Sequence, residues 1–112
     1  DALKNKQKAI SDIGNLLEGT SLIDRFKIIE GYDNKKNLKY FFEILSRAIF
    51  SSIIEGSNED EVGLSGAVPT SMSINRKVEM AKKILKIYRN LDYNVSLRIA
   101  LEEMMIKDVI SD

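Results

Sequence analysis

The sequence predicts an all-α protein, a compact bundle of about five helices with one long loop. Apolar side chains recur at spacings of three and four residues in five segments, which is the period of a helix buried along one face. Glycine, serine and other turn-forming residues separate these segments. The 112 residues, of which 44% are hydrophobic and 30% charged, suit a single domain, residues 1–112, with one modest core.

The first two helices are expected at residues 2–18 and 22–30. Gly19 is a natural stop for the first helix, and Gly31 ends the second. Ser21 precedes the second helix, and its hydroxyl can cap free amides at the helix start. The side chains expected to face inward are Leu3, Ala9, Ile10, Ile13, Leu16 and Leu17, followed by Leu22, Phe26 and Ile29.

A third helix, at residues 37–54, is the most apolar segment of the chain. Its broad apolar face holds Leu38, Phe41, Phe42, Leu45, Ala48, Ile49 and Ile53, and is widened by Tyr40, Ile44 and Phe50. A stripe that wide predicts neighbours on more than one side. Residues 55–73 then collect glycines, serines, Pro69 and an acidic run, with only isolated apolar side chains. They predict a long loop that folding does not require.

The last two helices are expected at residues 74–91 and 97–109, and Ser96 can cap the second of them. The core-facing side chains are expected to be Val78, Ala81, Ile84, Leu85, Tyr88 and Leu91 in the fourth helix and Leu97, Ala100, Leu101, Met104 and Met105 in the fifth. Flexible thioethers fill gaps in cores and also suit adaptable interfaces. Met104 is expected in the core, and Met105 is a candidate for an interface.

The composition disfavours several classes of function. The chain has no cysteine and no histidine, so it lacks the thiolate nucleophile, the usual zinc ligands and the side chain best suited to proton transfer near neutral pH. We therefore expect no enzyme activity and no cofactor. Lysine plus arginine and aspartate plus glutamate number 17 each, so no net field favours direct contact with nucleic acid. No apolar run reaches the roughly 18 residues of a membrane span, and a cytoplasmic location follows as the default.

Features that could carry chemistry have simpler structural explanations. The glycines at 56, 63 and 66 lack the Gly-Lys-Ser/Thr of a phosphate loop, and the acidic residues 59–61 lack the alternation of a calcium loop. Glu102 and Glu103 are adjacent in a helix, hence about 100° apart. One of them is expected to face water and the other a neighbouring helix or subunit. The triplet Asn94-Val95-Ser96 is better explained as a turn into a capped helix than as a glycosylation acceptor.

The last third of the chain carries a resemblance to a known family. Ala81-Lys82-Lys83-Ile84-Leu85 leads into Asn90 and Leu91, and then comes Asn94-Val95-Ser96-Leu97-Arg98-Ile99-Ala100-Leu101-Glu102. This stretch resembles the closing part of delta-prime subunits of bacterial clamp loaders, where a helix leads to an Asn-x-Asn turn, a proline and a Leu-x-Leu-Glu helix. Ser96 stands in place of the second asparagine and Leu97 in place of the proline. Residues 41–50 and 15–19 are similar to the family's apolar middle helix and its opening helix.

The resemblance implies a collar domain, the C-terminal oligomerisation domain that packs beside equivalent domains in the pentameric clamp loader of DNA polymerase III. Such a domain supports sliding-clamp loading in DNA replication and catalyses nothing itself. Its partners would be the other clamp-loader subunits, and the expected interface includes Arg98, Glu102, Glu103 and Met105. Because the chain begins at Asp1 without a methionine, we expect it to come from a longer protein, and the resemblance implies that it is the C-terminal part of a clamp-loader subunit.

Two alternatives to a delta-prime domain remain. The related gamma/tau subunits carry an equivalent helical domain, although termination soon after the last helix favours delta-prime. From a different class, a free-standing helical adaptor would bind a partner helix or peptide. An ATPase-like module encoded upstream of Asp1 is expected for a clamp-loader subunit and is not required for an adaptor.

Overall fold

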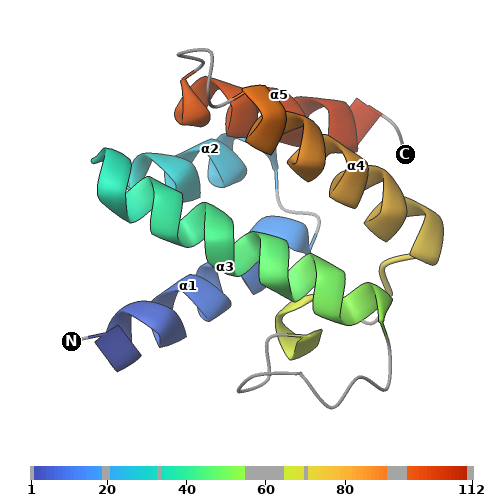
Figure 1. The fold of residues 1–112 in the computed structure, drawn as a ribbon, viewed down its shortest axis with the longest axis horizontal. Coiled ribbons are helices and arrows are strands. Elements are labelled where there is room, and N and C mark those ends of the chain that lie inside the picture. The colour runs from blue at the N-terminus through green and yellow to red at the C-terminus, as the bar shows by residue number, and fades with distance from the viewer. Residues whose placement is uncertain are drawn as a thin grey trace.

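The structure, a computed structural model, describes residues 2–18, 21–32, 34–54, 65–69, 71–90 and 96–110. In order along the chain they form α1 (Ala2–Leu17), α2 (Leu22–Glu30), α3 (Lys35–Ile53), the short 3₁₀ helix η2 (Ser65–Ala67), α4 (Ile74–Asn90) and α5 (Leu97–Ile110). Figure 1 shows these helices packed into one bundle, so the predicted all-α fold is confirmed. Across the described ranges, no helix is both long and apolar enough to cross a membrane.

α3 is the central helix of the bundle. It packs against α1, α4, α5 and η2, while α2 packs against α1 and α5 (Figure 1). Because neighbours lie on several sides of α3, Phe41, Phe42 and Leu45 are completely buried. The prediction that its wide apolar stripe meets more than one neighbour is therefore confirmed. The Cα radius of gyration is 13.2 Å, as expected for a compact domain of this length.

Polar side chains cap the starts of four helices. Each accepts a hydrogen bond from a backbone N–H three residues later, an amide that the helix itself leaves free. The distances are 3.2 Å from Asp24 N to Ser21 Oγ, 2.8 Å from Asn37 N to Asn34 Oδ1, 3.1 Å from Arg76 N to Ser73 Oγ and 3.4 Å from Ile99 N to Ser96 Oγ. The predicted caps at Ser21 and Ser96 are confirmed. The Asn34 cap starts α3 at Lys35, earlier than predicted.

The face that α4 turns to the core coincides only in part with the one its sequence predicts. Ala81 and Ile84 are buried as predicted. Leu85 and Tyr88, both predicted core residues, are 47% and 38% exposed. Apolar side chains occupy much of the circumference of α4, so its neighbours decide which face is buried. Because α4 packs against both α3 and α5, the face between them is covered. Its buried side chains are Met80, Ala81, Ile84 and Ile87. Of the other predicted core residues, Val78 is half-buried and Leu91 lies outside the described residues.

The second part of the predicted loop contributes to the core. Ala67, Val68 and Met72 are only 7%, 4% and 5% exposed. They lie in and after η2, which packs against α1 and α3. The expectation that folding does not need residues 55–73 is therefore wrong for this part, because its apolar side chains shield both helices from water. Residues 55–64 lie outside the described residues.

Candidate association surface

The inner face of α5 holds this helix in the bundle. Leu101, Met104 and Met105 are 0%, 3% and 0% exposed, and α5 packs against α2, α3 and α4. Three neighbouring helices cover a wide arc of α5, which takes in Met105 as well as Met104. The structure therefore corrects the assignment of Met105 to the interface, because its side chain lies among the chain's own helices.

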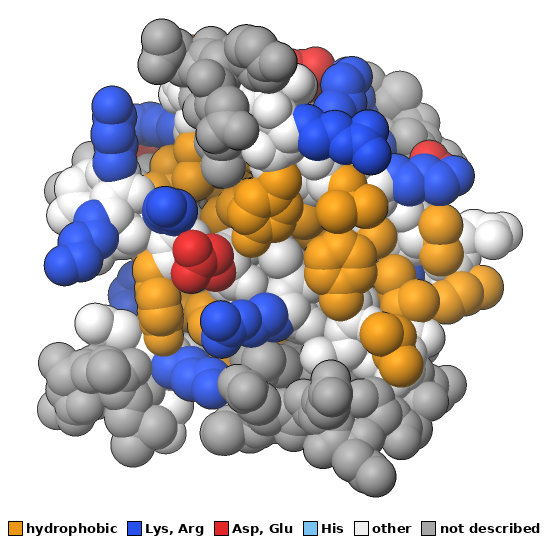
Figure 2. Space-filling model, viewed as in Figure 1, with side chains coloured by type: hydrophobic (Ala, Val, Ile, Leu, Met, Phe, Trp, Pro, Cys, Tyr) orange, Lys and Arg blue, Asp and Glu red, His pale blue; other side chains and the backbone are white. Residues whose placement is uncertain are grey.

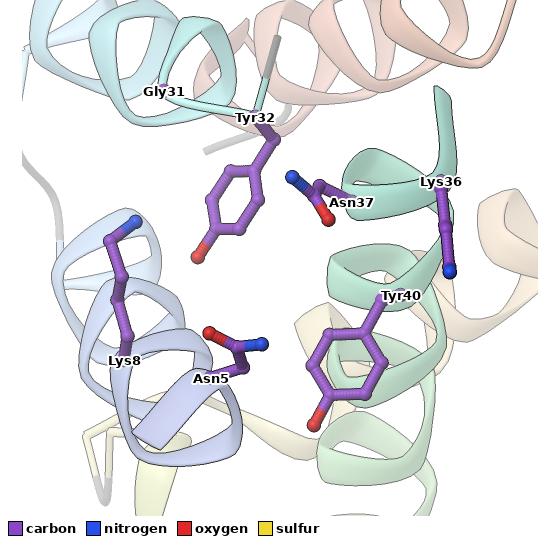
Figure 3. A pocket seen from close by; sticks show the side chains of 7 residues that line it. All are labelled: Asn5, Lys8, Gly31, Tyr32, Lys36, Asn37 and Tyr40. Carbon is purple, nitrogen blue, oxygen red and sulfur yellow. The ribbon is translucent and has the colours of Figure 1, made fainter. Parts of the chain in front are cut away.

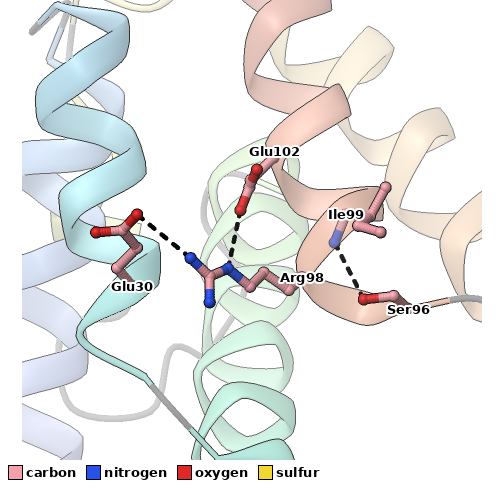
Figure 4. A network of polar contacts seen from close by, with 5 residues as sticks. All are labelled: Glu30, Ser96, Arg98, Ile99 and Glu102. Atoms are coloured by element: carbon pink, nitrogen blue, oxygen red, sulfur yellow. Dashed lines mark hydrogen bonds and ion pairs between the residues drawn. The ribbon is translucent and has the colours of Figure 1, made fainter.

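Arg98 joins α5 to α2 (Figure 4). Its Nη2 atom is 3.3 Å from Oε1 of Glu30 on α2, and its Nε atom is 3.0 Å from Oε1 of Glu102, one turn further along α5. The Arg98 side chain is 48% exposed, so each ion pair contributes at most about 1 kcal/mol. Arg98 and Glu102 lie at the surface, as the interface prediction requires, but they also connect two helices of the same chain.

Glu103 points away from that network. Its Oε1 atom is 2.9 Å from Nζ of Lys107, and its side chain is 61% exposed. The hydrogen bond and charge of Lys107, with a smaller effect from Lys86, lower the pKa of Glu103 below its ordinary value. Glu103 is therefore ionised at neutral pH. The side chain of Glu102 is 29% exposed and pairs with Arg98 of the same helix, so Glu103 is the one of the two glutamates that faces water, as predicted for one of them.

The outer side of α5 is apolar as well. Ile99 and Ile106 are 64% and 37% exposed, and together with Glu103 they follow one line along the helix, here called the α5 outer strip. The strip borders a groove of about 120 Å³ between α4 and α5. The groove is lined by Lys83, Lys86, Ile87, Asn90, Ile99, Ala100, Glu103, Met104 and Lys107. Small-molecule sites usually exceed roughly 300 Å³, so this groove suits the side chains of a protein partner better.

A larger cleft lies between α1, α3 and the end of α2. Its volume is about 410 Å³, which is within the range of small-molecule sites. In Figure 3 the Tyr32 ring enters the space between α1 and α3. The lining residues are Asn5, Lys8, Gly31, Tyr32, Lys36, Asn37 and Tyr40.

Two of the lining residues, Tyr32 and Lys8, bind Asp12 on α1. The Tyr32 hydroxyl donates a hydrogen bond of 2.5 Å to Oδ2 of Asp12, and Nζ of Lys8 lies 3.2 Å from the same oxygen and 4.5 Å from the centre of the Tyr32 ring. Tyr32 also stacks on Phe41, with ring centres 4.4 Å apart. Burial, followed by the hydrogen bond and charge of Asp12, raises the pKa of Tyr32 well above its ordinary value. These contacts explain the cleft as a junction that ties α1 and α3 to the end of α2.

Within the part of the chain that the structure describes, no group of three His, Cys, Asp or Glu residues is placed to hold a metal ion.

No protein-family model matches the chain, and no curated protein or solved structure shows significant similarity to it. The interface prediction did not include Ile99 and Ile106, whose side chains are exposed on α5. A signal for Ile99 was available, because it precedes the core residue Leu101 by two positions and so lies about 200° around the helix from it.

Proposed function

We propose that this chain is a non-catalytic protein-association domain and that its α5 outer strip binds another protein. The observation that carries this proposal is that α5 is apolar on two sides. Leu101 and Met104 lie in the core, while Ile99 and Ile106 on the other side are exposed. A surface helix normally has one apolar stripe opposite a polar face, and an additional exposed stripe is typical of an interaction site.

The outer strip can supply a substantial part of a binding free energy. Complete burial of an isoleucine side chain is worth about 1.5–3 kcal/mol relative to full exposure. Ile99 is 64% exposed and Ile106 is 37% exposed, so covering both contributes roughly 1.5–3 kcal/mol, or roughly ten- to hundredfold in affinity. The ionised Glu103 between them adds selectivity for a partner with a complementary charge.

We further propose that the partners are the other subunits of a DNA polymerase III clamp loader, with this chain as a collar domain of the delta-prime type. The most informative part of the resemblance to that family is the stretch from Asn94 to Glu102, of which residues 97–102 form the start of α5 and include Ile99. Ser96, which replaces an asparagine of the family pattern, caps α5 as an asparagine would. In this role the domain supports sliding-clamp loading during DNA replication in the cytoplasm.

Binding of this chain to purified clamp-loader subunits of the same organism, followed by biolayer interferometry, tests the proposal. Ile99→Gln removes apolar surface and Glu103→Lys reverses a charge, and each is expected to weaken binding about tenfold. Glu79→Lys is a matched control for Glu103→Lys, because both glutamate side chains are 61% exposed and pair with a lysine. Thermal melts show whether each variant is folded, since surface substitutions usually change stability by less than about 0.5 kcal/mol.

Reversal of Arg98 is a poorer test, because Arg98→Glu would bring its new carboxylate close to those of Glu30 and Glu102 and so disturb the contact between α2 and α5. Failure of the wild-type chain to bind any clamp-loader subunit would overturn the choice of partner. Equal binding by wild type and Ile99→Gln would instead show that the outer strip is not the contact surface.

A further inference from the structure

α3 and α4 share an apolar surface that lies away from the α5 outer strip. We call it the α3/α4 face and define it by six apolar side chains at the end of α3 and along α4 that are exposed or half-buried: Phe50, Ile54, Ile74, Val78, Leu85 and Tyr88. Four of them are well exposed, with 62% for Ile54, 55% for Ile74, 47% for Leu85 and 38% for Tyr88. Figure 2 shows hydrophobic side chains gathered across this side of the molecule, over α3 and the adjoining part of α4. Large apolar side chains that gather on one surface mark an interaction site more often than scattered ones do.

The shape of this face matches a helix. Ile74, Val78, Leu85 and Tyr88 follow one line along α4, which spans about 21 Å at 1.5 Å per residue. Ala81 lies in the middle of this line, and its small side chain is buried. α4 runs antiparallel to α3 (Figure 1), and the Tyr88 ring lies 4.8 Å from that of Phe42 in the first half of α3. The line of apolar side chains therefore continues beside α3 for about four turns, the length over which a bound helix would place side chains at i, i+4, i+7 and i+11.

The charges beside this face are mostly positive. Lys39 and Arg47 lie on the exposed side of α3, and Arg89 lies on α4 next to the line through Leu85 and Tyr88. Glu43 is one carboxylate between the two cations of α3. Figure 2 shows Lys and Arg side chains at the border of the apolar area. A partner with carboxylates beside its apolar residues would complement this arrangement.

We propose that the α3/α4 face binds an amphipathic helix of a partner protein, with acidic residues flanking the apolar stripe of that helix. A second copy of this chain fits less well, because a twofold contact through the same face would set its cations against the same cations. This surface is separate from the α5 outer strip: Lys83, which lines the α4/α5 groove, is two residues from Leu85 and so nearly opposite it on α4. Binding here is therefore independent of the proposed clamp-loader contact.

A labelled synthetic helix of about 18 residues tests this proposal through fluorescence anisotropy. One peptide carries leucines at i, i+4, i+7 and i+11 with glutamates on both flanks, and its control carries lysine at every glutamate position. The glutamate peptide is expected to bind at least about tenfold more tightly than the lysine peptide, with a difference that shrinks as salt is added.

Variants of this chain locate the binding to the face. Leu85→Gln is expected to weaken binding of the glutamate peptide at least about tenfold. The double variant Lys39→Glu/Arg47→Glu is expected to reverse the preference between the two peptides. Ile23→Gln is the control, since Ile23 is 68% exposed on α2 and lies outside both surfaces. Thermal melts confirm that each variant is folded.

Three results would overturn the proposal. The first is a failure of either comparison: the chain binds the two peptides with equal affinity, or Leu85→Gln binds the glutamate peptide as tightly as the wild type does. The second is tighter binding to vesicles with anionic headgroups than to the peptide, with the same Leu85→Gln sensitivity, which would assign the face to a membrane surface. The third is a concentration-dependent dimer in analytical ultracentrifugation that Leu85→Gln abolishes, which would assign it to a second copy of this chain.

Discussion

Truncation of two leucines tests which face of α4 belongs to the core. Leu101 on α5 is 0% exposed, while Leu85 on α4 is 47% exposed although the sequence predicts it to be buried. Leu101→Ala and Leu85→Ala remove the same atoms from the two environments. A difference between the two losses in the free energy of unfolding therefore comes from the burial of each leucine and not from the atoms removed.

The expected costs differ severalfold. Leu101→Ala leaves a cavity among α2, α3, α4 and α5, and such truncations lower the free energy of unfolding by about 2–5 kcal/mol. Leu85 is already about half in water and leaves no enclosed cavity, so Leu85→Ala should cost about 1 kcal/mol or less. At about 4 °C per kcal/mol for a domain of this size, the melting temperature should fall by about 8–20 °C for Leu101→Ala and by at most about 4 °C for Leu85→Ala.

Urea unfolding followed by far-UV circular dichroism measures both costs. Equal m-values for wild type and the two variants show that the unfolding transitions are comparable. If Leu85→Ala costs as much as Leu101→Ala, then α4 buries Leu85 as its sequence predicts, and the α3/α4 face does not exist in solution.

Three further predictions concern the junction at Tyr32, the cap of α5 and the segment after η2. The pKa of Tyr32 is higher in the folded state than its unfolded value of about 10. The hydroxyl therefore contributes fully to the free energy of unfolding below pH 10, and this contribution is lost as the pH rises above 10. In urea titrations, Tyr32→Phe should cost about 1–2 kcal/mol at pH 7 and less above pH 10. Ser96→Ala should cost about 1 kcal/mol, measured by thermal melts, because Ile99 N loses its acceptor. Val68→Ala should lower the melting temperature measurably, because Val68 is buried. Shortening the segment 56–63 should leave the melting temperature unchanged. An unchanged melting temperature for Val68→Ala would contradict the burial of Val68.

Helix positions were predictable because the signals that start and end a helix are local. Ser21 and Gly31 enclose α2 at its predicted bounds, and Ser96 starts α5 as predicted. A capping side chain bonds an amide only three residues away, so its effect does not depend on the rest of the fold. The helical period is also local, and it predicted that Arg98 and Glu103 lie at the surface.

Burial on α4 and α5 depended on contacts between segments far apart in the sequence. α4 has apolar side chains on two adjoining faces, and only its packing against α3 and α5 decides that Ile87 is buried while Leu85 is not. Met105 is buried for a similar reason, since α5 lies against three helices. A helical period shows which side chains share a face, but which face loses contact with water is set by neighbours that the local sequence does not encode.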